Sequence, residues 1–180
     1  MTRSTFLKTT MAAAGLTASA QAAETGGREY VEIRKITLKS PEKQALLETY
    51  LRDAAIPALN KLGVSEVGVF LPEKPDGNAV VYVLLRHASL ETVAKSADVL
   101  SEAAVQQAGA AYLDVTAEEP VYERIESWLT RGIGGMPGMK VPPKGSGLYQ
   151  LRIYESHSEK AAKKKIEMFD IGELAIFARC

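Results

Sequence analysis

The chain has 180 residues, of which 46% are hydrophobic, and its 22 Lys and Arg residues balance its 22 Asp and Glu residues. This length fits one domain and a fragment, and the even charge removes the strong electrostatic case for nucleic-acid binding. A local basic run at Lys163–Lys165 is interpreted as a solvated helix face. One cysteine excludes an intrachain disulfide and a cysteine-based metal cluster, and two histidines are too few for a multi-histidine metal site.

Residues 1–22 have the pattern of an export signal. Arg3 and Lys8 supply positive charge and a short apolar run follows. The small-residue cleavage rule is fitted by Ala20-Gln21-Ala22 and, as a second choice, by Ala18-Ser19-Ala20. The run is too short to span a bilayer. The start also resembles a twin-arginine signal, but Ser4 replaces the second arginine, so the twin-arginine and general secretory routes both stay open. The sequence predicts a periplasmic or secreted protein in which residues 23–27 form a linker.

Strand and helix patterns alternate through residues 28–131. A nearly unbroken apolar run at 80–85 predicts a central strand that is covered on both faces. The order strand, helix, strand, strand, helix, strand is typical of an α+β, ferredoxin-like unit, with both helices on one face of an antiparallel sheet. The predicted ranges are 29–38, 64–71, 78–86 and 121–129 for strands and 41–62 and 90–112 for helices, with a turn at 72–77.

Local signals place the ends of the two helices. Ser40 followed by Pro41 predicts a capped helix start, Pro57 predicts a kink, and Gly63 ends the helix. Ser89 is the predicted cap of the second helix. The predicted inward-facing residues are Leu47, Tyr50 or Leu51, Ala54, Ala58 and Leu62 in the first helix, and Val93, Ala97, Leu100 and Ala104 in the second.

The remaining chain reads as a linker and the start of a second unit. Residues 132–146 are rich in glycine and proline and lack the spacing of a phosphate-binding loop. Alternating residues predict a strand at 149–154, and Ser156 with Glu159 predicts a capping box that opens a helix. The apolar face of this helix carries Ala162, Ile166, Phe169, Glu173 and Phe177.

This C-terminal part, residues 147–180, repeats the opening of the first unit. Val31–Arg34 matches Tyr149–Arg152 in character, and Leu47–Tyr50 matches Ile166–Phe169. One strand and one helix cannot bury the apolar stripe by themselves, so we expect the first unit to cover it.

Several of these segments closely resemble the NIPSNAP domain. They are Tyr154–Glu159, Lys165–Phe169 and Gly172–Phe177, together with Arg124–Ser127 and the turn at Gly135–Pro137. The resemblance implies a dimeric α/β-barrel, in which two ferredoxin-like units pair their sheets, either within one chain or between two copies. In similar exported bacterial proteins the second copy continues through two more strands, a helix and a last strand. The chain therefore looks truncated, and the resemblance supplies no catalytic residues.

Three hypotheses for function stay open. The chain is a binding or scaffold protein without a cofactor, a small-molecule enzyme (monooxygenase-like or haem-related), or a fragment without activity of its own. The enzyme hypothesis rests on Arg152, Tyr154, His157 and Glu173. Arg152 and Tyr154 are predicted to share a strand face, His157 lies at a helix start that favours its neutral form, and Glu173 is predicted to pair with Arg152 when buried.

Each of these residues also has a simpler interpretation. His157 is then an exposed first-turn residue, and Glu173 lies at the edge of the apolar stripe with its carboxylate in water. His87 is interpreted as an ordinary loop residue after the third strand. The most economical prediction is an exported binding or interaction protein that associates with itself.

Overall fold

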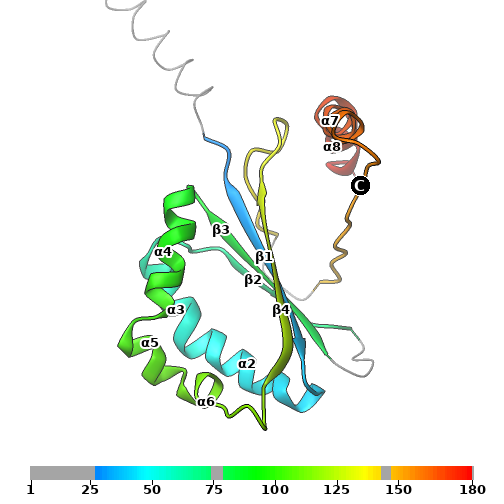
Figure 1. Cartoon of the computed structure of the whole chain (residues 1–180). Helices are drawn as coiled ribbons and strands as arrows, with labels where there is room; N and C mark the ends of the chain where they lie inside the picture. Colours follow the sequence, from blue (N-terminus) through cyan, green and yellow to red (C-terminus); the bar gives the residue numbers. More distant parts are fainter. Residues whose placement is uncertain (1–26, 74–78, 143–146, 180) are drawn as a thin grey trace, which may run out of the picture.

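Four antiparallel strands form one sheet in the computed structural model, which describes residues 27–73, 79–142 and 147–179. The strands lie in the order β2-β3-β1-β4, and the helices between them cover one face (Figure 1). This is the ferredoxin-like fold that the sequence predicts. The export signal, nearly all of the linker after it and most of the turn at 72–77 lie outside the described residues. The strands are β1 (Tyr30–Leu38), β2 (Val67–Phe70), β3 (Val80–His87) and β4 (Tyr122–Arg131).

Only one face of the sheet is buried. In β3 the side chains of Val81, Val83 and Leu85 are buried under the helices, whereas the residues between them are half-buried. The prediction that this strand is central is confirmed, because β3 lies between β2 and β1. The prediction that it is covered on both faces is wrong, because no helix or strand of the described chain packs over the second face.

The first helical segment runs without a break from Pro41 to Lys61. Pro57 has no N–H to donate, and the chain adjusts with a π-helical turn just before it, in which the N–H of Ile56 donates to the carbonyl of Leu51. The Ser40 side chain makes no hydrogen bond to a backbone N–H of the first turn, contrary to the capping prediction. The parts are η1 (Pro41–Lys43), α2 (Gln44–Tyr50), η2 (Leu51–Ala55) and α3 (Ile56–Lys61).

The second helical segment is divided into three. The Ser89 capping box with Thr92 confirms the predicted start, but the helix breaks near Ser101 and again at Gly109. The inward face also differs from the prediction, because Ser96 and Val105 are buried whereas the predicted Ala97 and Ala104 are exposed. The parts are α4 (Leu90–Leu100), α5 (Ala103–Ala108) and α6 (Ala110–Leu113).

The C-terminal part differs most from the prediction. Residues 147–156 form no strand, because no neighbouring strand supplies hydrogen bonds, and Ser158 caps the following helix instead of Ser156. The helical run is α7 (Glu159–Met168), η3 (Phe169–Glu173) and α8 (Leu174–Phe177), and none of its residues is buried.

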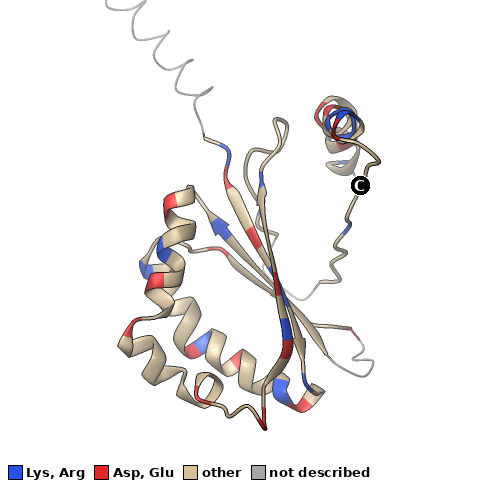
Figure 2. Cartoon of the chain, viewed as in Figure 1, with Lys and Arg blue, Asp and Glu red and all other residues tan. Residues whose placement is uncertain are grey.

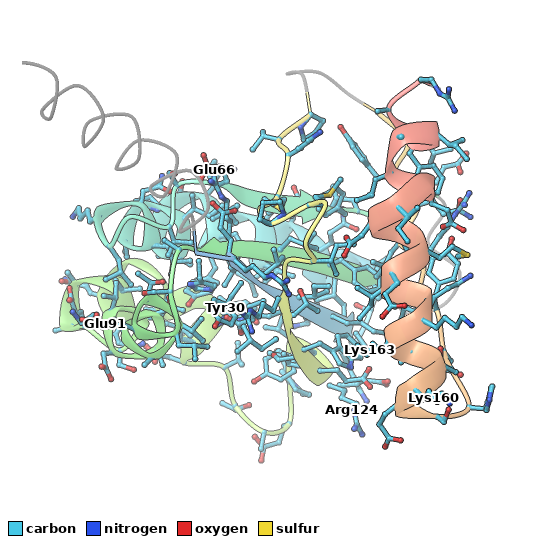
Figure 3. All side chains as sticks on the ribbon, turned by 90° about the horizontal axis from the view of Figure 1, so that it is seen from above. Tyr30, Glu66, Glu91, Arg124, Lys160 and Lys163 are labelled. Atoms are coloured by element: carbon cyan, nitrogen blue, oxygen red, sulfur yellow. The ribbon has the colours of Figure 1, made fainter. Side chains whose placement is uncertain are left out.

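The expected packing of this helix on the first unit is also not formed. The helix stands on the opposite side of the sheet from α2–α6, as seen at α7 with its labelled Lys160 and Lys163 (Figures 1 and 3). Two contacts hold the segment near the sheet. The Gly135 N–H donates to Asp170 Oδ1 at 2.7 Å, and the Tyr149 ring meets Phe70 edge-on at 5.2 Å between centroids.

Charges of both signs are interspersed along the strands and helices (Figure 2). This mixture agrees with the even charge of the sequence and leaves no large basic face on the described part of the chain. None of the helices in that part is long and apolar enough to cross a membrane.

Candidate functional site

Two charged residues lie on the helix-covered face of β1. The period of two places Glu32 and Arg34 on the same side of the strand as the buried Ile36 and Leu38. Arg34 Nε donates to Glu32 Oε1 at 2.6 Å, and Nη2 donates to Oε2 at 3.2 Å. The two side chains are 28% and 13% exposed. Such a two-bond pair has a fixed geometry and satisfies both carboxylate oxygens.

His87 ends β3 beside this pair, and its side chain is fully buried. Its Nε2 lies 3.6 Å from Glu32 Oε2, beyond hydrogen-bond distance, and neither ring nitrogen has a partner among the described residues. Burial lowers the pKa of His87, Glu32 opposes that shift and Arg34 adds to it. The imidazole is therefore neutral near pH 7.

Three tyrosines lie near this pair, Tyr50 from α2, Tyr112 from α6 and Tyr122 from β4. The rings of Tyr50 and Tyr112 are stacked with 4.5 Å between centroids, and Tyr122 is 6.3 Å from Tyr112. Burial raises the pKa of both Tyr50 and Tyr112. Their hydroxyl groups stay protonated over the physiological range and can donate hydrogen bonds.

A cavity of about 370 Å³ lies between the sheet and the helices, bordered by Glu32, Arg34 and the three tyrosines. Its apolar walls include Leu47, Leu51, Leu59, Val83 and Leu85, all of which are buried. Tyr122, Ile125 and Ser127 line it from the edge strand β4 and are exposed to solvent. The cavity thus has largely apolar walls and is partly open to solvent, with exposed lining residues along β4, which suits a small-molecule site.

The four residues predicted from the sequence lie outside this cavity, and the structure does not assemble them into a site. Arg152 donates to Gln150, and Tyr154 packs edge-on against Phe169 with a centroid distance of 5.3 Å. His157 is exposed and Glu173 is half-exposed. The predicted salt bridge between Arg152 and Glu173 is not formed, because residues 147–156 do not make the strand on which the prediction depended.

Glu32, Arg34 and His87 are not among the site residues that the sequence predicts. The signal was present, since the alternation of Val81, Val83 and Leu85 continues directly to His87. The interpretation of His87 as a loop residue is wrong, because β3 extends one residue beyond the predicted strand. The same alternation in β1 carries two charges onto the buried face, a pattern that is costly unless the charges are paired.

No group of three or more metal-binding side chains comes together in residues 27–73, 79–142 and 147–179. The Glu32–His87 pair supplies two potential ligands, and Arg34 beside it disfavours a cation. The arrangement suits an organic molecule that accepts hydrogen bonds better than a metal ion.

Several solved structures resemble the fold of this chain. A NIPSNAP family protein of Agrobacterium tumefaciens is 21% identical with a TM-score of 0.47, and the match covers 61% of this chain and 97% of that one. A dimeric protein of unknown function with a ferredoxin-like fold, from Bacteroides fragilis, is 16% identical with a TM-score of 0.42, covering 57% and 95%. A Bacillus cereus protein, described as a candidate antibiotic biosynthesis monooxygenase, is 14% identical with a TM-score of 0.40, covering 69% and 100%.

Solved NIPSNAP family proteins are thus among the structures that this chain resembles. No protein-family model and no curated protein matches its sequence. Identities of this size concern the fold and do not assign an activity.

Proposed function

We propose that this chain is an exported, NIPSNAP-type binding protein that holds a small, largely apolar molecule between its sheet and helices. The cavity of about 370 Å³ carries the proposal, because its interior is apolar and its one charged pair is already neutralised. A molecule that enters from the β4 edge would remove apolar surface from water without stripping an unpaired charge.

Filling the cavity tests this proposal. Ala55 lines the cavity and is 2% exposed, so Ala55→Leu places three more carbons inside it. We expect this variant to bind the uncharged fluorophore N-phenyl-1-naphthylamine about tenfold more weakly in a fluorescence titration.

Ala94→Leu is the matched control, because Ala94 is an exposed residue in the middle of α4. Its affinity for the fluorophore should equal that of the parent chain. Equal affinities for all three proteins would place the fluorophore on another apolar surface and contradict the proposal. Thermal melting of each variant shows that the comparison is between folded proteins.

We also propose that the uncovered face of the sheet associates with a second copy. Apolar side chains gather there, including Ile33 on β1, Leu84 on β3 and the 43%-exposed Trp128 on β4. An apolar patch across three strands is uncommon on a monomer. Ile33→Glu should convert a dimer to a monomer in sedimentation velocity, whereas Ala94→Glu on α4 should not. A monomeric parent chain would contradict the association.

A small-molecule enzyme, monooxygenase-like or haem-related, is the alternative function. One observation favours it: the imidazole of His87 is buried and neutral and has no hydrogen-bond partner among the described residues, so one ring nitrogen is free to act as a base. A haem or flavin absorbance band in the purified protein would support this alternative, and retention of that band in His87→Phe would exclude His87 from the cofactor site.

The proposal also includes an export signal that is cleaved off and a division of the chain into two units. We propose cleavage after residue 22, a first unit over residues 28–131, a linker at 132–146 and a partial second unit at 147–180. N-terminal sequencing of the protein recovered from the periplasm or medium should begin at Ala23. A protein that retains Met1 would contradict export through a cleaved signal.

A further inference from the structure

In the charged pair of the cavity, Arg34 can still donate hydrogen bonds, whereas the acceptor oxygens of Glu32 are already used. Both oxygens of Glu32 accept from Arg34, and Oε2 also faces His87. Arg34 uses Nε and Nη2 in this pair, and no described residue accepts a hydrogen bond from Nη1. The pair therefore leaves N–H donors on the more exposed of its two side chains.

Ser127 adds a second donor at the same place. It lies directly opposite Arg34 in the register between β1 and β4, so both side chains are on the cavity face. The Ser127 hydroxyl makes no hydrogen bond to a described residue, and it is exposed at the open edge. A guanidinium and a hydroxyl on neighbouring strands form a site for an acceptor group with two oxygens.

The tyrosines make the surroundings donor-rich as well. Tyr50 and Tyr112 line the cavity, and the positive charge of Arg34 acts on both of their hydroxyl groups. Among the described residues, Glu32 is the one carboxylate that lines the cavity, and both of its oxygens accept from Arg34. An ammonium group entering here would have to displace Arg34 from Glu32, whereas a carboxylate can use the second edge of the guanidinium.

We propose that the molecule bound in this cavity is an apolar monocarboxylate, with its carboxylate on Arg34 and Ser127 and its hydrocarbon part among Leu47, Leu59 and Val83. This inference rests on the proposed binding function and names the chemical class of its ligand. Arg34 bridges two carboxylates, Glu32 on one edge and the ligand on the other, so Glu32 acts as a positioning residue that fixes the guanidinium plane.

Three eight-carbon molecules that differ in the head group test the class. Isothermal titration of the full chain at pH 7.5 with octanoate, 1-octanol and octylamine compares an anion, a neutral molecule and a cation with equal tails. We expect octanoate to bind about tenfold more tightly than octanol, and octylamine to bind most weakly. Octanol or octylamine binding as tightly as octanoate overturns the carboxylate assignment. Absence of binding for all three, with no fluorophore binding, contradicts the binding function itself.

Two variants locate the carboxylate. The double variant Glu32→Gln, Arg34→Gln removes both charges together and should reduce octanoate affinity to that of octanol. Ser127→Ala removes one exposed hydroxyl and should weaken octanoate about threefold without changing octanol, while Ser101→Ala, at the exposed end of α4, changes neither. Retention of the octanoate preference in the double variant overturns the assignment. If the double variant does not fold, Ser127→Ala decides instead: a preference for octanoate over octanol equal to that of the parent chain overturns the assignment.

Discussion

Arg34→Met is expected to lower the free energy of unfolding by about 2–3 kcal/mol, because it leaves the Glu32 carboxylate without its partner in a site that is 13% exposed. This loss is smaller than that for a fully buried pair, because both side chains are partly exposed to water. Chemical denaturation followed by circular dichroism measures the change. Trp128, the only tryptophan, gives a second signal from β4.

Replacing both charges distinguishes the pairing from simple loss of packing. In Glu32→Leu, Arg34→Met no charge is left unpaired, so the double variant should recover to within about 1 kcal/mol of the parent chain. Arg52→Met is the matched control, since Arg52 pairs with Asp53 at the surface, where the loss should stay below about 0.5 kcal/mol. An effect of Arg34→Met no larger than that of Arg52→Met would contradict a structural role for the pair.

The first unit could be predicted from the sequence because its signals are local. The alternation in β1 and β3, the Ser89 cap and Gly63 after α3 each act within a few residues, and the ferredoxin-like order follows from them. Pro57 predicted a kink in the helix, and the structure has a π-helical turn directly before this proline.

The C-terminal strand could not be predicted in the same way. Residues 149–154 have the alternation of a strand, but a strand forms through hydrogen bonds to a neighbour, and the described chain supplies none. The apolar face of α7–α8 is likewise left uncovered, with Ile166 44% exposed and Phe177 50% exposed.

The candidate site was missed because it depends on distant residues meeting. Glu32 comes from β1, His87 from β3 and Tyr112 from α6, and only the sheet register and the packing of α6 bring them together. A one-residue error at the end of β3 was enough to change His87 from a buried residue to a loop residue. The general signal was a polar residue at a position where the alternation requires an apolar one, and such positions merit a search for a partner.

His87 gives the second large effect, on the pH dependence of stability. Burial lowers the pKa of His87 below its ordinary value of 6.5, so the unfolded chain binds the proton more readily than the folded chain. Stability is then complete above about pH 6.5 and is lost as the pH falls toward the lowered pKa, with a slope of up to ~1.4 kcal/mol per pH unit. His87→Phe should remove this slope between pH 7 and pH 5.

The other histidine supplies the control for that measurement. His157 is exposed, so His157→Phe should leave the slope between pH 7 and pH 5 unchanged. Carboxylates such as Glu29, whose pKa is lowered by its hydrogen bond to Arg86, add their own loss only at lower pH, because folding changes their charge below about pH 4.5. A parent chain equally stable at pH 7 and pH 5 would contradict a buried, neutral His87. If the free energy of unfolding of His87→Phe kept the same slope, the pH dependence would belong to another titratable group.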